Sequence, residues 1–333
     1  DLNENPFEID NRIPKNNKSL AVKVATMSAV KKALSAGADY VYLGAEVSPV
    51  RGEGWTKEDL QDAVDMAHDM GRKIAYGTPR ICTSRELSEI EWLFDIGSRV
   101  GVDGILAHNL GAIHCAKQFD LDMFADFSFN ILNTGSIEML EKLGVKRITS
   151  SIESSFNDLN KLARDSTLPV ESIVHGSLPS MLLEHCLPAM LVTKTNAKSG
   201  CRLPCRYINY ALKDEKGEVR TIEVDQYCRN HIMFASDLCV LPYLNSFLMT
   251  DVDMFRIEAQ YYEDDLVETV VNQYRKRMDL LMENPSVFCP LPEAEWNNLV
   301  VKSPKGLSLC AYSQNVTHSR STLEVMKKAT QTN

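Results

Sequence analysis

The sequence predicts an α/β fold in which eight parallel strands close into a barrel with helices between them. Short β-branched or apolar runs alternate with amphipathic stretches over residues 20–284. Eight such units can be counted, and parallel strands need crossover connections, which the amphipathic stretches provide. Eight parallel strands close without leaving a free edge, which favours a barrel over the alternative, an open doubly wound sheet.

The predicted strands are short runs of apolar or β-branched residues, and a long helix over 266–282 follows the last of them. Together they predict a TIM-like (β/α)8 barrel. The eight runs are 21–24, 40–43, 73–76, 104–107, 123–125, 147–149, 170–174 and 254–257.

Helix boundaries are clearest in the first two units. The first helix ends at Gly37, where a C-terminal cap favours a residue that tolerates positive φ. The second begins after Thr56, an N-cap residue with Asp59 three positions later as its capping-box partner, and it ends at Gly71.

Three segments describe the domain organisation. Residues 1–19 are polar and predict an extended lead-in, and residues 20–284 form the barrel with a cysteine-rich insertion at 175–239. Residues 285–333 predict a C-terminal extension on the outside of the barrel. The chain begins at Asp1 without an initiator methionine, so we expect further domains in a longer chain.

Composition excludes some classes of protein. The chain has 333 residues, 44% of them hydrophobic, which can supply a full core. The net charge of −9 argues against a broad electrostatic attraction to nucleic acid but leaves room for a local basic patch. The sequence has neither a run of about 18 apolar residues nor a secretory signal, so we expect a cytoplasmic protein.

Five of the nine cysteines lie in the insertion. Cys186, Cys201 and Cys205 stand among Gly, Pro and Arg rather than on an apolar periodic face, where a structural thiol is expected. With Cys228 they make four, the usual shell of a [4Fe–4S] cluster or a structural zinc ion. Structural zinc sites favour C-x2-C spacing, which is absent here, so the pattern favours the cluster over zinc or no metal.

Other residues near these thiols have predicted roles. Arg202 and Arg206 are predicted to bind an anionic part of the substrate, because the planar guanidinium pairs with carboxylate or phosphate. Cys239 is the alternative to Cys228 as fourth ligand, although its apolar neighbours suit packing.

Carboxylates follow three of the predicted strands. Glu46, Glu153 and Glu258 would converge on one cavity of a barrel, where they could act as acid or base or bind substrate, although surface solvation explains each equally well. His175 at the end of the seventh strand is a candidate to orient an anion or transfer a proton. No H-E-x-x-H or G-x-S-x-G motif occurs, so the sequence does not predict a conventional hydrolase.

Several segments resemble the peptidase U32 family, also called the collagenase-like or PrtC-like proteins. The central motif, at 175–186 and 200–206, is specific, and the other segments support it. Two positions depart from the family pattern: Pro179 stands where members often have a cysteine, and Gln260 where an arginine is common. The supporting segments are 36–44, 235–239, 256–258 and 270–275.

The resemblance implies a TIM-like barrel with a [4Fe–4S] cluster. Relatives in this family carry out oxygen-independent hydroxylation of RNA bases or of a quinone precursor, with prephenate proposed as oxygen donor. We therefore expect an iron–sulfur enzyme that modifies an RNA base or a small aromatic compound. The alternatives are a U32 peptidase and a non-catalytic module in which zinc staples the insertion.

Overall fold

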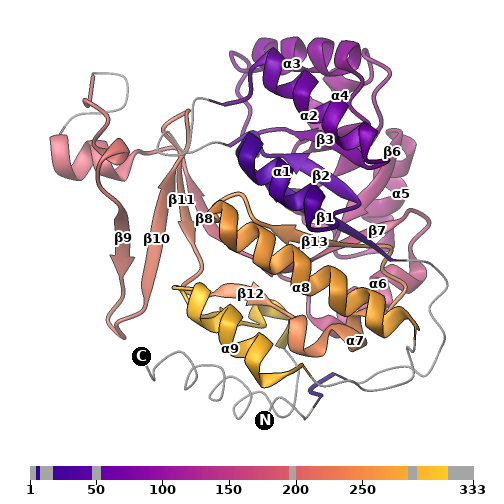
Figure 1. The fold of residues 1–333 in the computed structure, drawn as a ribbon. Helices are drawn as coiled ribbons and strands as arrows, with labels where there is room; N and C mark the ends of the chain where they lie inside the picture. Colours follow the sequence, from indigo (N-terminus) through magenta and orange to yellow (C-terminus); the bar gives the residue numbers. More distant parts are fainter. Residues whose placement is uncertain (1–4, 8–17, 47–53, 195–199, 284–290, 314–333) are drawn as a thin grey trace.

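The computed structural model describes residues 5–7, 18–46, 54–194, 200–283 and 291–313. Its centre is a closed barrel of eight parallel strands surrounded by helices (Figure 1). Strand β13 pairs with both β1 and β7 and so closes the barrel, which confirms the predicted fold and excludes the open sheet. The barrel strands are β1 (Ser19–Val24), β2 (Tyr40–Leu43), β3 (Lys73–Gly77), β4 (Ile105–Ala107), β5 (Met123–Ala125), β6 (Val145–Thr149), β7 (Val170–Gly176) and β13 (Met254–Glu258).

A helix follows each of the first six strands and β13, and this outer layer covers the barrel wall. Helix α2 begins with the predicted capping box: the Thr56 hydroxyl accepts from the Asp59 amide at 3.1 Å, and the Asp59 carboxylate accepts from the Thr56 amide at 3.0 Å. The helices are α1 (Met27–Ser35), α2 (Lys57–Asp69), α3 (Leu87–Val100), α4 (Leu110–Ala116), α5 (Thr134–Lys142), α6 (Phe156–Asp165), α7 (Leu244–Leu248), α8 (Asp264–Glu283) and α9 (Glu293–Lys302).

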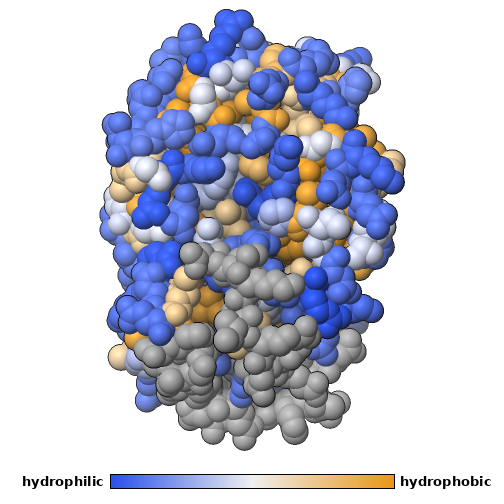
Figure 2. Space-filling view, turned by 90° about the vertical axis from the view of Figure 1, so that its right-hand side faces the viewer, coloured by the Kyte–Doolittle hydropathy of each residue, from blue (hydrophilic) through white to orange (hydrophobic). Residues whose placement is uncertain are grey.

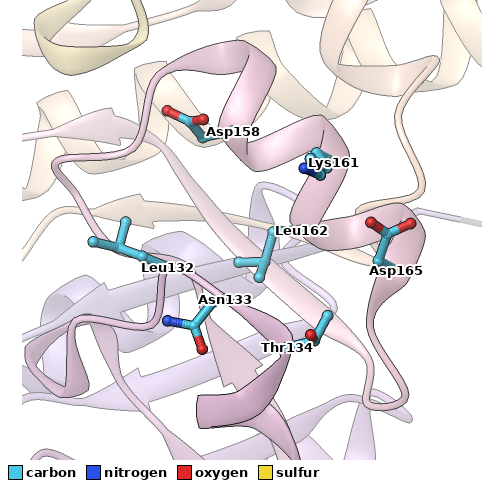
Figure 3. A pocket seen from close by; sticks show the side chains of 7 residues that line it. All are labelled: Leu132, Asn133, Thr134, Asp158, Lys161, Leu162 and Asp165. Atoms are coloured by element: carbon cyan, nitrogen blue, oxygen red, sulfur yellow. The ribbon is translucent and has the colours of Figure 1, made fainter.

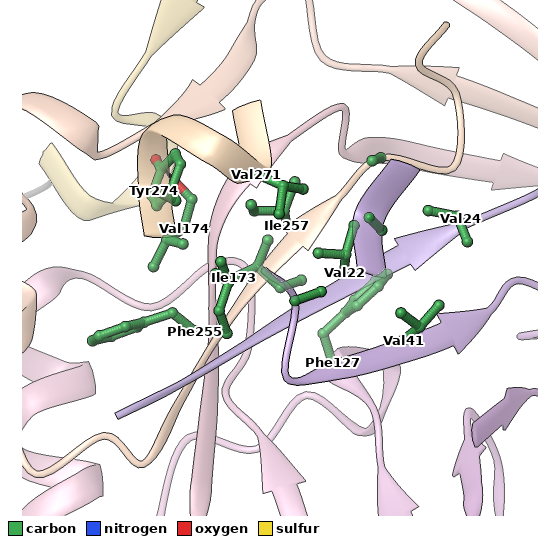
Figure 4. Close-up of a cluster of buried hydrophobic side chains, with 14 of the residues drawn as sticks. Val22, Val24, Val41, Phe127, Ile173, Val174, Phe255, Ile257, Val271 and Tyr274 are labelled. Carbon is green, nitrogen blue, oxygen red and sulfur yellow. Dashed lines mark hydrogen bonds between the residues drawn. The ribbon is translucent and has the colours of Figure 1, made fainter. Parts of the chain in front are cut away.

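The main hydrophobic core lies between the barrel wall and the helices. Figure 4 shows Ile257 of β13 and Val174 of β7 directed toward Val271 and Tyr274 of α8. Each of these side chains is at most 1% exposed, and full burial of such a side chain stabilises the fold by about 1.5–3 kcal/mol. The alternation of side chains along each strand sends the neighbouring residues into the barrel, where polar groups collect.

The insertion between β7 and β13 carries a second, four-stranded antiparallel sheet in the order β8-β11-β10-β9. This sheet stands beside the barrel in Figure 1, and its strands are β8 (Pro179–Leu183), β9 (Tyr210–Lys213), β10 (Val219–Val224) and β11 (Asn230–Met233). The place of the insertion is as predicted, but its regular structure was not anticipated from the sequence. Strand β12 (Asp237–Cys239) returns to the barrel sheet and pairs antiparallel with β7.

Parts of the predicted lead-in and extension pack on the barrel. Phe7 is 5% exposed and its ring lies 4.4 Å from that of Phe156. Strand β14 (Leu307–Ser308) pairs with β12, and Tyr312 donates a hydrogen bond to the Ile173 carbonyl at 2.8 Å. The rest of these two segments, at 1–4, 8–17, 285–290 and 314–333, lies outside the described residues.

Figure 2 shows the side of the molecule opposite the four-stranded sheet. Most of that face is hydrophilic, with apolar residues visible in seams between polar ones. Among the described residues, no helix combines the length and apolar composition needed to cross a membrane.

Candidate active site at the barrel mouth

The four-stranded sheet is fastened to the carboxyl ends of the barrel strands. Arg229 of the insertion lies 2.8 Å from the Glu86 carboxylate, measured from Nη2 to Oε1. Gln226 donates a hydrogen bond to the Ala45 carbonyl at 2.6 Å. The insertion therefore lies at the barrel mouth, the end at which barrel enzymes place their chemistry.

The structure brings the four predicted cysteine ligands together. Cys186, Cys201 and Cys205 are buried, Cys228 is partly buried, and all four are free thiols. Cys186 and Cys201 form one buried cluster against which Cys228 packs. Burial, and then the charges of the other three thiols, raise the pKa of Cys228 to about 11.

The spacing of the four sulfurs indicates what they can hold. A single zinc ion with bonds of about 2.3 Å requires tetrahedral sulfurs about 3.8 Å apart. No three of these four Sγ atoms all lie within 4.8 Å of one another. Four thiolates are the usual donor set of an iron–sulfur cluster, whose several iron atoms span a wider shell than one zinc ion does.

The turn between β10 and β11 presents Cys228. One carboxylate oxygen of Asp225 accepts from the amides of Tyr227 and Arg229, each at 2.9 Å. Cys228 has φ of +63°, a left-handed conformation that L-residues rarely adopt. Such strain concentrates at functional sites and persists only where the surroundings enforce it, which is the role of the Asp225 carboxylate here.

Cys239, the alternative fourth ligand, lies elsewhere. It is 0% exposed in β12, where it pairs with His175 of β7. Burial raises the pKa of its thiol to about 12, and none of the four clustered cysteines contributes to that shift. The geometry therefore groups Cys228, and not Cys239, with the other three thiols.

A first group of charged side chains joins the barrel to the insertion. Arg80, after β3, lies 2.6 Å from Nδ1 of His231 on β11, and its Nε lies 3.4 Å from the Glu46 carboxylate. Nε2 of His231 lies 3.0 Å from Asp225. Burial opposes ionisation of Glu46, but the charges of Arg80, His231, His108 and Lys23 outweigh it and lower the Glu46 pKa to about 2.

A second group lies inside the mouth. Nε2 of His108 is 2.9 Å from Asp126 and 3.3 Å from Nζ of Lys23. The Ser128 hydroxyl donates to the His108 carbonyl at 2.7 Å, so it accepts the proton of His108 Nδ1 at 2.8 Å. His108 Nε2 can therefore accept a hydrogen bond from Lys23 or, once protonated, donate one to Asp126, an arrangement suited to acid–base chemistry.

Arg256 occupies the centre of the barrel. Its guanidinium lies 2.8 Å from Glu171 and 3.0 Å from Glu258, and it also pairs with Asp126. Burial alone would raise the Asp126 pKa, but Arg256, His108 and Lys23 hold it well below its usual range. The barrel interior thus combines this ionised network with a buried apolar cluster that includes Tyr42, Leu106 and Phe124.

The predicted acid–base residues separate into two groups. Glu46 and Glu258 lie at the mouth, each 6% exposed, and both contact the network described above. Glu153 is exposed to solvent on the loop after β6 and has no described contact with either of them. The prediction that Glu153 converges with the other two carboxylates is therefore wrong, because the turn at 151–154 leaves its side chain exposed to solvent.

His175 faces the helical layer instead of the mouth. Its ring is 0% exposed and lies 5.4 Å from the ring of Tyr274 on α8 and 6.0 Å from that of Tyr262. Neither ring nitrogen has a hydrogen-bond partner among the described residues, and burial lowers the His175 pKa to about 3. This position supports packing, and it gives no support to the predicted contact with substrate.

Arg202 and Arg206 flank the buried Cys201 and Cys205 and are both exposed. Arg202 also has a left-handed backbone, with φ of +58°. Their guanidinium groups are therefore available to a ligand beside the thiols, as the prediction requires.

Sequence reasoning missed most of the charged residues at the mouth. Asp126 follows β5 directly and Lys23 alternates with apolar neighbours on β1, so strand-end and alternation rules could have found them. His231 and Asp225 could not be found in this way, because they reach the mouth from the insertion. A separate cavity of about 250 Å³ lies outside the barrel between α5 and α6, and its lining includes neither the thiols nor these charged residues (Figure 3).

Comparison with known proteins identifies a matching family and several relatives. The family model described as peptidase family U32 matches residues 25–309. An uncharacterized protease of Methanocaldococcus jannaschii is 26% identical over 77% of this chain and 64% of its own length. The 23S rRNA 5-hydroxycytidine synthase of Escherichia coli is 24% identical over 76% of this chain and 38% of its own length.

A third relative, tRNA hydroxylation protein P of Helicobacter pylori, is 23% identical over 81% of this chain and 66% of its own length. The chain thus spans less than two thirds of each of these three relatives. The expected cytoplasmic location stays a prediction.

Proposed function

The chain belongs to peptidase family U32, and from this premise we propose that it is an iron–sulfur enzyme that hydroxylates an RNA base without molecular oxygen. The observation that carries the proposal is the meeting of four free thiols, from distant parts of the insertion, beside the barrel mouth. The Escherichia coli and Helicobacter pylori relatives are named for modification of rRNA and tRNA, which supports the substrate class.

Cys186, Cys201, Cys205 and Cys228 would hold a [4Fe–4S] cluster. When bound, such a cluster supplies one-electron transfer, at a potential set by hydrogen bonds and solvent exposure around its sulfurs. Arg202 and Arg206 would offset its negative charge or bind a phosphate of the RNA. A small aromatic substrate is the alternative to an RNA base.

The chain's own acid–base groups lie at the mouth. His108, between Lys23 and Asp126, would move a proton to or from the reacting base or the oxygen donor. Glu46 would stay ionised beside Arg80, and Glu258 would pair with Arg256, so that both hold this network in place. An anionic oxygen donor such as prephenate would suit the cationic side chains here, and it stays the expected donor.

Anaerobic purification followed by iron and sulfide analysis tests the cofactor. We expect a brown protein with about four iron atoms per chain. Cys228→Ser should lose most of the iron, whereas the matched control Cys239→Ser should keep it. A colourless protein without iron after reconstitution would overturn the proposal.

The hydroxylation step is tested separately with the reconstituted protein. RNA incubated anaerobically with the enzyme and prephenate should contain a nucleoside whose mass has gained one oxygen atom. The same RNA incubated with the Cys228→Ser protein should not. An iron-loaded enzyme that leaves every RNA and small aromatic compound unchanged would contradict the proposed reaction.

The peptidase alternative rests on the family description and on the name of the archaeal relative. The pairing of Cys239 with His175 could suggest a nucleophile and its base, but both side chains are 0% exposed. Casein or collagen cleavage that survives replacement of all four clustered cysteines would favour the peptidase. Stoichiometric zinc in place of iron would favour the stapled, non-catalytic module.

A further inference from the structure

A wide pocket lies where the insertion meets the barrel, next to the cysteine site. Its volume is about 440 Å³, within the range of small-molecule sites. Its walls come from the segment before α2, from β3, from α3 and from the turn between β10 and β11. The residues used below are Trp55, Tyr76, Glu89, Trp92, Gln226 and Tyr227.

Four of these side chains are aromatic. Trp92 projects from α3 and is 56% exposed, although Ile90, Phe94 and Ile96 of this helix are buried. Trp55 is fixed by a hydrogen bond from its indole nitrogen to the Gly44 carbonyl at 2.8 Å. An exposed tryptophan beside a fixed one leaves apolar ring surface available to a planar ligand.

The pocket also has polar groups. Tyr227 donates a hydrogen bond to Oε2 of Glu89 at 3.3 Å, which ties the insertion to α3 across the pocket. The Glu89 carboxylate accepts hydrogen bonds only, so it selects a ligand that carries N–H or O–H donors. The guanidinium of Arg229 lies 4.9 Å from the ring centre of Tyr227 and supports that ring from one side.

The pocket adjoins the cysteine site through the backbone, because Tyr227 precedes Cys228 in the turn that Asp225 organises. The pocket wall and the candidate ligand Cys228 therefore belong to the same turn. This adjacency separates the pocket from a generic apolar surface patch.

We infer that the pocket formed by Trp55, Trp92, Tyr227 and Glu89 binds an unpaired nucleobase with an exocyclic amino group: cytosine, adenine or guanine. Aromatic side chains stack on the faces of unpaired bases, and a carboxylate accepts a hydrogen bond from the amino group of such a base. Uracil has no amino group and offers the carboxylate only its ring N3–H, so it should bind less well. The choice of a base as ligand rests on the proposed function.

Tryptophan fluorescence of the iron-loaded protein provides the test. The chain has three tryptophans, and Trp296→Phe removes the buried one on α9, leaving the two in the pocket as reporters. We expect CMP and AMP to quench the emission with an affinity at least about fivefold higher than that of UMP. Ribose 5-phosphate, which lacks a base, should have no effect.

Two variants in this background separate stacking from hydrogen bonding. Trp92→Ala should weaken CMP binding by at least about fivefold, the low end of one base-stacking interaction, as monitored through Trp55. Glu89→Gln should reduce the preference for CMP over UMP while leaving UMP affinity unchanged. Met139→Ala, an exposed apolar residue on α5, is the matched control and should change neither.

Three outcomes would overturn the inference. The first is quenching by ribose 5-phosphate as strong as by CMP, and the second is an unchanged CMP affinity in Trp92→Ala. The third is tighter binding of N-acetyltyrosinamide or tetramethylammonium than of any nucleotide. The last would assign the pocket to a peptide or a cation. Because the titration requires no turnover, it can succeed when hydroxylation fails. Conversely, iron loading and hydroxylation that persist in Trp92→Ala would leave the proposed function intact and remove only this pocket.

Discussion

Asp225 holds His231 through one carboxylate oxygen, at 3.0 Å from Nε2, and organises the turn containing Cys228 through the other. His231 in turn contacts Arg80 of the barrel at 2.6 Å. The Asp225 carboxylate therefore connects the charged side chains at the barrel mouth to Cys228, whose backbone has the left-handed conformation.

Asp225→Asn should consequently weaken metal retention without unfolding the barrel. An amide can still accept from the turn amides, but it loses the charge that pairs with His231, so the turn should loosen. We expect iron to be lost to a chelator at least several times faster than from the wild type, with little change in circular dichroism.

Asp214→Asn is the matched control for that variant. Asp214 organises the β9–β10 turn in the same way, through amides of Lys216 and Glu218 at 2.9 Å each, but its turn carries no cysteine. Equal rates of iron loss in the two variants would show that Asp225 has no special role.

His175 should make stability depend on pH. Burial lowers its pKa to about 3, below the value of about 6.5 in the unfolded chain. Between these two pKa values the unfolded chain binds one more proton than the folded chain. The contribution of neutral His175 to the free energy of unfolding is therefore complete above pH 6.5, and it falls by about 1.4 kcal/mol per pH unit as the pH decreases.

Urea unfolding of His175→Gln at pH 6 and pH 4 measures this effect. The wild type should lose about 2–3 kcal/mol more than the variant between these two pH values. His114→Gln, at an exposed position on α4, should behave as the wild type. Parallel pH profiles of wild type and His175→Gln would mean that His175 accepts a proton in the folded state and is not buried as described.

Much of the fold could be predicted because the barrel strands have a local signature. Strands β2, β7 and β13 are buried along their full length. The first is an uninterrupted run of apolar and aromatic residues, and the other two each have three apolar residues with polar ones among them. Strands β8 and β9 are largely exposed, and each alternates weakly within a segment rich in Gly, Pro and Cys. The antiparallel sheet therefore had no comparable signal.

The site could be predicted in part for a related reason. Glu46 and Glu258 both lie at the mouth because strand ends meet there in any parallel barrel, but the face that a residue occupies depends on register. A register shift between Arg256 and Ile257 pairs Ile257 with His175, and both then face α8. The local sequence contains no signal for such a shift, so the prediction that His175 faces the barrel mouth was wrong.

Arg256→Met should destabilise the protein by about 3–5 kcal/mol. It would leave the carboxylates of Asp126, Glu171 and Glu258 buried without their shared cation, and breaking a buried ion network by removing one partner costs about that much. Urea unfolding at pH 7 is the measurement. Arg99→Met removes an exposed arginine paired with Asp95 and should cost less than about 1 kcal/mol, so similar destabilisation in both variants would refute the network's importance.

Replacing both Arg202 and Arg206 by Gln should weaken RNA binding while iron content stays unchanged. Both side chains are exposed beside buried thiols, where they can reach phosphates without supporting the fold. For single-stranded RNA, each phosphate that a cationic side chain neutralises adds about 0.7 to the steepness of log affinity against log salt, so the double variant should be less steep by about 1.4. The matched control, Lys142→Gln with Lys146→Gln, makes the same change in charge on α5 and β6 and should leave the slope as in the wild type. An equal fall in slope for both double variants would mean that the attraction follows net charge and that the two arginines bind no specific phosphate of the RNA.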